Sequence, residues 1–139
     1  MVQIIAGIKG KGKTKRLLDM ANTAVKDARG SVVYLDKSSK HMYELSNKIR
    51  LINVSEFNIM TSDGFIGFVS GIISQDHDLE KLYLDGFLDC AKLTADTAAD
   101  TIEQLNAIGE LYGIDIHISF SASASSLPED LKKKVMIEV

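Results

Sequence analysis

The stretch VQIIAGIKGKGKT, residues 2–14, decides the fold of this 139-residue chain. Its first part, Val2 to Ala6, is an apolar run that ends directly at a glycine, which is the pattern of a buried strand. After the loop, apolar residues recur at helical spacing and predict a helix from Thr14 to Asp27, with Gly30 as a stop signal. The stretch therefore predicts a strand, a glycine-rich loop and a helix in direct succession.

The loop carries the pattern G-x-x-x-x-G-K-[ST] in full, at Gly7, Gly12, Lys13 and Thr14. Glycines let the backbone take positive φ and approach a ligand without a Cβ in the way. Successive N–H groups can then form an anion nest, to which the helix N-terminus adds about half a positive charge. We therefore predict a nucleoside triphosphate site in which Lys13 reaches the β- and γ-phosphates and Thr14 binds Mg²⁺.

The candidate binding residues extend over the whole loop. Lys9, Lys11 and Lys15 could add to the attraction for phosphate, the alternative being that they are ordinary solvated lysines. The full set comprises Gly7, Lys9, Gly10, Lys11, Gly12, Lys13, Thr14 and Lys15.

Apolar runs and helical patterns alternate along the rest of the chain. Strands are expected at residues 31–36, 49–54, 81–85 and 114–120, and helices at residues 39–47, 63–75 and 94–112. Residues 129–134 could add a short helix, and residues 135–139 could add a terminal strand. This alternation predicts one α/β domain over residues 1–139, a three-layer sandwich with a mostly parallel central sheet of about five strands. The glycines of the 63–75 helix suggest close packing on the sheet.

Mg²⁺ beside such a loop needs a carboxylate, usually from the end of a buried strand. Asp85 ends one apolar strand and is our first candidate for the magnesium ligand. Asp36 ends another apolar strand and is the second candidate. The catalytic candidates are Lys13, Asp85 and Asp89, where Asp89 could orient a water or simply lie at the surface. Three serines, Ser119, Ser121 and Ser123, could sense the γ-phosphate or form a polar loop.

Composition narrows the functional classes. Residues 1–50 have a net charge of +7 and residues 51–139 a net charge of −10, which could mean an anionic ligand in the first half or head-to-tail self-association. Only one cysteine, Cys90, is present, so no internal disulfide is expected. With no signal peptide or membrane span in the pattern, we expect a cytoplasmic protein. No aromatic series accompanies the lysines, so we do not expect nucleic acid as a partner.

The loop at residues 7–14 and the strand that leads to Asp85 resemble the P-loop NTPase superfamily, in its RecA-like and thymidine-kinase-like branch. They are also similar to small ATP-binding proteins of Firmicutes that are labelled twitching-motility ATPases. In this branch the acid strand is followed by a helix and a polar-tipped strand, which is the order seen here from Asp85 to Ser121. The resemblance implies nucleotide binding, although Gly86 stands where active members carry a glutamate.

Three functions remain open from the sequence. The first is a slow ATPase or GTPase, or a nucleotide switch, that acts with a protein partner or as a homo-oligomer. The second is a small-metabolite or nucleoside phosphotransferase, with Asp36 as general base and Ser38 to Asn58 as a substrate lid. The third is a nucleotide-binding scaffold that does not hydrolyse.

Overall fold

The computed structural model describes residues 1–139 and shows an α/β fold built on one sheet. All six strands are parallel, in the spatial order β3-β2-β4-β5-β1-β6. The strands are β1 (Val2–Ala6), β2 (Ser31–Asp36), β3 (Arg50–Asn53), β4 (Leu79–Leu84), β5 (Asp115–Phe120) and β6 (Val135–Glu138). Because every strand runs in the same direction, the carboxyl ends of all six meet at one edge.

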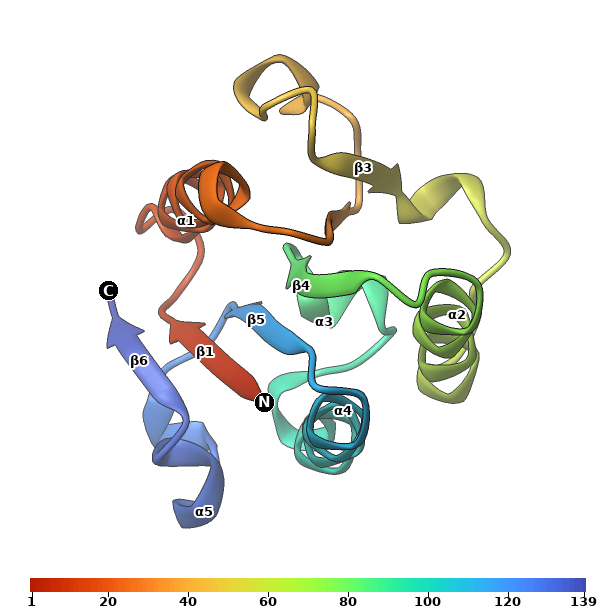
Figure 1. The fold of residues 1–139 in the computed structure, drawn as a ribbon. Helices are drawn as coiled ribbons and strands as arrows, with labels where there is room; N and C mark the ends of the chain where they lie inside the picture. Colours follow the sequence, from red (N-terminus) through yellow and green to blue (C-terminus); the bar gives the residue numbers. More distant parts are fainter.

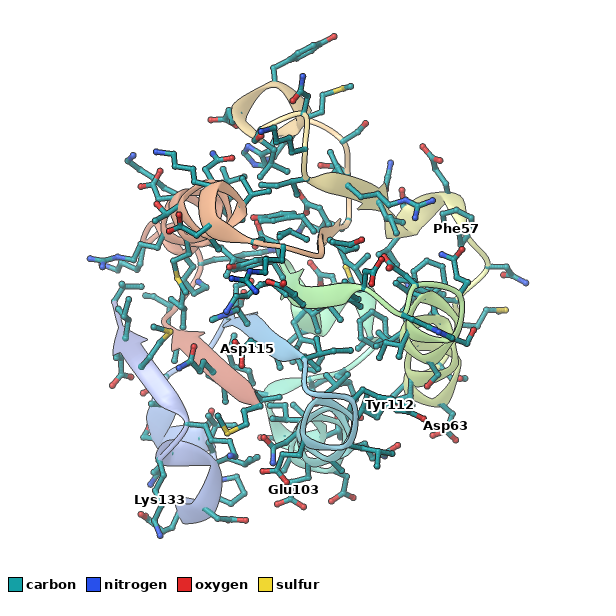
Figure 2. The ribbon with its side chains drawn as sticks, viewed as in Figure 1. Phe57, Asp63, Glu103, Tyr112, Asp115 and Lys133 are labelled. Atoms are coloured by element: carbon teal, nitrogen blue, oxygen red, sulfur yellow. The ribbon has the colours of Figure 1, made fainter.

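Helices cover both faces of the sheet (Figure 1). One face packs on α1 (Lys13–Asp27), through Leu17, Leu18 and Ala21. The other face packs on α2 (Ser62–Gln75) and α4 (Ala99–Tyr112), with the short helices α3 (Phe87–Cys90) and α5 (Glu129–Lys132) beside them. Figure 2 shows Asp63, Glu103 and Lys133 on the outer surface of this layer. No helix is long and apolar enough to cross a membrane.

The sheet has six strands rather than the expected five. The sixth is the C-terminal run, in which β6 pairs with β1 and Val139 donates its N–H to the Ala6 carbonyl at 2.9 Å. Its alternation of half-buried and exposed residues is that of an edge strand, with one face on the protein. The expected mostly parallel sheet is confirmed, and it is parallel throughout.

Two expected helices differ in the structure. Residues 39–47 form only a single 3-10 turn, Met42–Glu44, because Asn22 of α1 holds the segment: its amide donates to the Glu44 carbonyl and its oxygen accepts from the Ser46 N–H, both at 2.8 Å. The 94–112 helix is divided at its start. There, Thr94 and Thr97 form a capping box around a separate 3-10 turn, Ala95–Thr97.

The expectation of close packing at the α2 glycines is wrong. A Cβ added at Gly67 or Gly71 would meet no atom within 4 Å, and both residues are exposed. Gly109 of α4 is the contrasting case, since a Cβ there would lie 2.7 Å from the Met1 nitrogen and 2.8 Å from the Ile114 oxygen. Close approach of a helix to its neighbours therefore depends on Gly109 and not on the glycines of α2.

Replacing Gly67 or Gly71 by alanine should raise the free energy of unfolding by about 0.5–1 kcal/mol each, because alanine loses less backbone entropy in a helix. Gly109→Ala is the matched control and should lower it. Urea unfolding followed by circular dichroism measures all three variants. Destabilisation by Gly67→Ala and Gly71→Ala would contradict this account of α2.

Candidate functional site

The largest cavity lies at the carboxyl edge of the sheet, next to the loop between β1 and α1. Its volume is about 650 Å³, and only two of its seventeen lining residues are hydrophobic. The polar lining comes from the loop, from the segment after β2, from the β4–α3 turn and from the end of β5. The residues are Lys9, Gly10, Gly12, Lys13, Thr14, Asp36, Lys37, Ser38, Lys40, His41, Asp85, Gly86, Leu88, Asp89, Leu93, Ser119 and Ser121.

The three glycines of the loop serve different needs. Gly10 and Gly12 have φ of 83° and 89°, in the left-handed region that favours glycine, although an added Cβ would meet nothing within 4 Å. Gly7 has a φ of 155° and is also required by space, because a Cβ there would lie 2.7 Å from the oxygen of Val139, the residue after β6. The loop conformation therefore depends on Gly10 and Gly12, and the fit of β6 beside β1 depends on Gly7.

The N-terminus of α1 is open to an anion. No side chain caps it, and its first turn contains no acidic residue. The N-terminus of α2, in contrast, is capped by Thr61, whose hydroxyl accepts from the Gly64 N–H at 3.0 Å. Free N–H groups and the positive end of the helix dipole therefore face the cavity at α1.

Lys13 lies at this helix start and is almost fully buried. Its Nζ donates to the Ile8 carbonyl at 2.9 Å, which holds the side chain back over the loop. Burial lowers the pKa of Lys13, and the nearby Asp85 carboxylate opposes that effect. An anion in the loop would give the Lys13 ammonium a stronger acceptor than a backbone carbonyl.

Asp85 is a buried carboxylate with four hydrogen-bond donors. Its Oδ1 accepts from the Ser119 hydroxyl at 2.9 Å, from the Gly86 N–H at 2.9 Å and from the Thr14 hydroxyl at 3.3 Å. Its Oδ2 accepts from the Tyr34 hydroxyl at 2.9 Å. These donors belong to β5, the β4–α3 turn, α1 and β2, so one side chain connects four elements around the cavity.

Asp36 lies at the end of β2 and lines the same cavity. Its Oδ1 accepts from the Lys37 N–H at 2.7 Å, whereas its Oδ2 is buried without a hydrogen-bond partner. Burial raises the pKa of Asp36, and the negative charge of Asp85 raises it further. A cation bound between these two carboxylates would relieve both effects.

The donor set suits Mg²⁺, an ion that takes oxygen ligands from one or two carboxylates together with substrate phosphates. Thr14, Asp85 and Asp36 offer a hydroxyl and two carboxylates in one cavity, and the unpartnered Asp36 Oδ2 is an available ligand atom. No group of three or more His, Cys, Asp or Glu side chains is placed to hold a metal ion. The residues present therefore fit a magnesium ion that would take its further oxygen ligands from a bound phosphate.

Asp89 belongs to α3 and is paired with Lys37, whose Nζ donates to its Oδ2 at 2.7 Å. Both side chains are about half exposed, at 46% for Lys37 and 55% for Asp89. The hydrogen bond from Lys37 lowers the pKa of the Asp89 carboxyl, which makes it a weaker base. An ion pair this exposed adds little to stability, about 0–1 kcal/mol.

The remaining candidates divide between the cavity and the surface. Lys9 lines the cavity, whereas Lys11 and Lys15 are exposed outside it and Lys15 points along α1 to Asp19. The Ser119 hydroxyl donates to the Asp85 carboxylate, and both Ser119 and Ser121 line the cavity. Gly7 and Ser123 lie outside the lining, and the Ser123 hydroxyl donates to Glu138. The single cysteine, Cys90, is buried, and burial raises its pKa to about 12.

The expected lid segment, residues 38–58, is divided between two cavities. Ser38, Lys40 and His41 line the polar cavity. Most of the residues after them surround a separate, more apolar cavity of about 600 Å³ beside β3, lined among others by Met42, Ile52 and Phe57. Figure 2 shows Phe57 on the outer side of the molecule, next to β3.

Two residues of the site were missed from the sequence. Tyr34 looks like a core residue because it lies inside an apolar run, and only the fold brings its hydroxyl to Asp85. Lys37 directly follows Asp36, a candidate carboxylate at the carboxyl end of a strand. Open α/β sheets bind ligands at that edge, so its position could have marked Lys37 as a site residue.

No family model matches the chain, and a search of characterised proteins finds no match.

Tyr34→Phe should lower the free energy of unfolding by about 2 kcal/mol, because it leaves a buried carboxylate oxygen without its donor. Tyr83→Phe is the matched control: Tyr83 stacks on Tyr34, with ring centroids 6.1 Å apart, but takes no part in the bonds to Asp85. Urea denaturation of both variants compares the losses. Equal losses would show that the Tyr34 hydroxyl has no special role at Asp85.

Proposed function

We propose that this chain binds ATP or GTP together with Mg²⁺ in the cavity beside Gly7–Thr14, as a P-loop NTPase of the RecA-like and thymidine-kinase-like branch, and hydrolyses the nucleotide slowly. One observation carries the proposal. The Thr14 hydroxyl and the Asp85 carboxylate, separated by 71 residues in the chain, lie 3.3 Å apart at the edge of the sheet.

The order of elements supports the proposed branch. Asp85 follows β4, α4 comes after it, and β5 then brings Ser119 to the Asp85 carboxylate. In the sheet, β5 lies between β1 and β4, so the loop and the acid reach each other across an intervening strand. This is the chain order expected from the resemblance: an acid strand, then a helix, then a polar-tipped strand.

Each part of the cavity has a role in holding a triphosphate. The free N–H groups of the loop and of the first turn of α1 would bind the phosphate oxygens, and Lys13 would exchange its bond to Ile8 for one to phosphate. Thr14 and Asp85 would bind Mg²⁺, and Asp36 is the second candidate carboxylate ligand. The bound ion would neutralise charge that develops on the phosphate oxygens during phosphoryl transfer.

We propose slow hydrolysis because the cavity lacks side chains that would speed phosphoryl transfer. None of the three arginines, Arg16, Arg29 and Arg50, lines the cavity, so no guanidinium is placed to stabilise the transferring phosphoryl group. Gly86 has no side chain to orient a water, and Asp89 is paired with a lysine. We propose that a partner protein or a second copy of this chain supplies the missing guanidinium and the group that orients water.

Calorimetry with the non-hydrolysable ATP analogue AMP-PNP tests the proposal. Lys13→Ala should weaken binding at least about tenfold, the value of a charge-assisted hydrogen bond. Thr14→Ala should weaken it when Mg²⁺ is present and change it little in EDTA, because the hydroxyl acts through the ion. Lys132→Ala, on α5 and away from the cavity, is the control. No binding by the wild-type chain at millimolar analogue would refute the proposal.

A further inference from the structure

Lys37 differs from the other lysines of the cavity. Four lysines line it, Lys9, Lys13, Lys37 and Lys40, and only Lys37 is in an ion pair. That pair joins the segment after β2 to α3, through the 2.7 Å bond to Asp89. The ammonium group of Lys37 is therefore at the cavity but occupied by a carboxylate of the chain itself.

The Lys37 side chain also lies over Gly86. A Cβ added at Gly86 would come within 3.3 Å of the Lys37 Cδ and 3.5 Å of its Cγ. The aliphatic stem therefore covers the residue directly after Asp85, and the absence of a side chain at Gly86 leaves room for it. Lys37 thus lies over the residue that follows the proposed magnesium ligand, in the cavity that the glycine-rich loop also lines.

We propose that Lys37 binds the terminal phosphate of the nucleotide and that Asp89 holds it aside until the triphosphate enters. This inference rests on the proposed nucleotide function and assigns a cation to a cavity that lacks arginine. When the triphosphate is bound, the Lys37 ammonium leaves the Asp89 carboxylate for a phosphate oxygen. Asp89 then acts as a competitor for Lys37 and not as a base toward water.

The physical chemistry of the pair favours this exchange. Both side chains are about half exposed, so water and salt screen their attraction and little is lost when they separate. Lysine carries its charge on a flexible four-carbon stem with three rotatable donors, which allows it to change partner without moving the backbone. A terminal phosphate carries more negative charge than one carboxylate and attracts the ammonium more strongly.

The test compares binding of AMP-PNP and ADP, each with Mg²⁺, by calorimetry. Lys37→Ala should weaken AMP-PNP binding about tenfold and ADP binding less than about twofold, because only the triphosphate offers the terminal phosphate. Asp89→Asn should tighten AMP-PNP binding about threefold, because it removes the competing carboxylate. Lys37→Arg should keep the preference for the triphosphate.

The two variants break the same ion pair, so a merely structural role predicts that both weaken binding alike. Lys81→Ala and Asp115→Asn are the matched controls for long-range charge: their pair also spans 2.7 Å, but it joins the starts of β4 and β5, and Figure 2 marks Asp115 there. Both controls should change AMP-PNP binding less than about twofold. Thermal melting confirms that each variant is folded.

Equal losses of AMP-PNP affinity in Lys37→Ala and Asp89→Asn would overturn the inference, as would equal losses for AMP-PNP and ADP in Lys37→Ala. If the wild-type chain binds AMP-PNP normally and Lys13→Ala weakens it, either result refutes the role of Lys37 alone. Failure of the wild-type chain to bind would refute the proposed function and this inference together.

Discussion

The arrangement at the sheet edge depends on the buried carboxylate of Asp85. A buried charge is costly unless it is paired or fully hydrogen-bonded, and Asp85 meets that need with donors from four elements. The same bonds fix where α1 begins relative to the sheet, through Thr14, and where β5 ends, through Ser119. Because α1 begins at the glycine-rich loop, the orientation of the loop toward the cavity follows from satisfying Asp85.

Around this carboxylate the cavity combines opposite charges in a small space. Asp85 and Asp36 line it, Asp36 has an oxygen without a hydrogen-bond partner, and lysines and the uncapped start of α1 line it as well. An anion alone would be repelled by the two carboxylates, and a cation alone by the lysines. A phosphate bound together with a divalent cation satisfies both sets of groups, which is why the proposed ligand is a magnesium nucleotide.

Much of the fold could be predicted because local signals agreed with the tertiary structure. The runs that became β1, β2 and β5 are apolar and bounded by glycine or polar residues, and the loop pattern places α1. The segment at residues 39–47 could not be predicted, since its helical pattern is overridden by bonds from Asn22 of another element. The spatial order of the strands is likewise a property of the packing, not of any one segment.

The candidate site shows the same division. Gly12, Lys13, Thr14 and Asp85 could be identified because loop chemistry and strand-end position each have a local pattern. Tyr34 could not, because an apolar run does not reveal that one hydroxyl within it meets a carboxylate on the next strand. The pairing of Asp89 with Lys37 joins residues 52 positions apart, and no local pattern indicates it.

The most direct test of the account is an NMR titration of the isotope-labelled chain with Mg²⁺ and AMP-PNP, following backbone amide resonances. We predict the largest shifts at Gly10, Gly12, Lys13 and Thr14, with smaller ones at Gly86 and Ser119, which both contact the Asp85 carboxylate. Shifts concentrated beside β3, around Met42 and Phe57, or no saturable shifts in the loop, would contradict it.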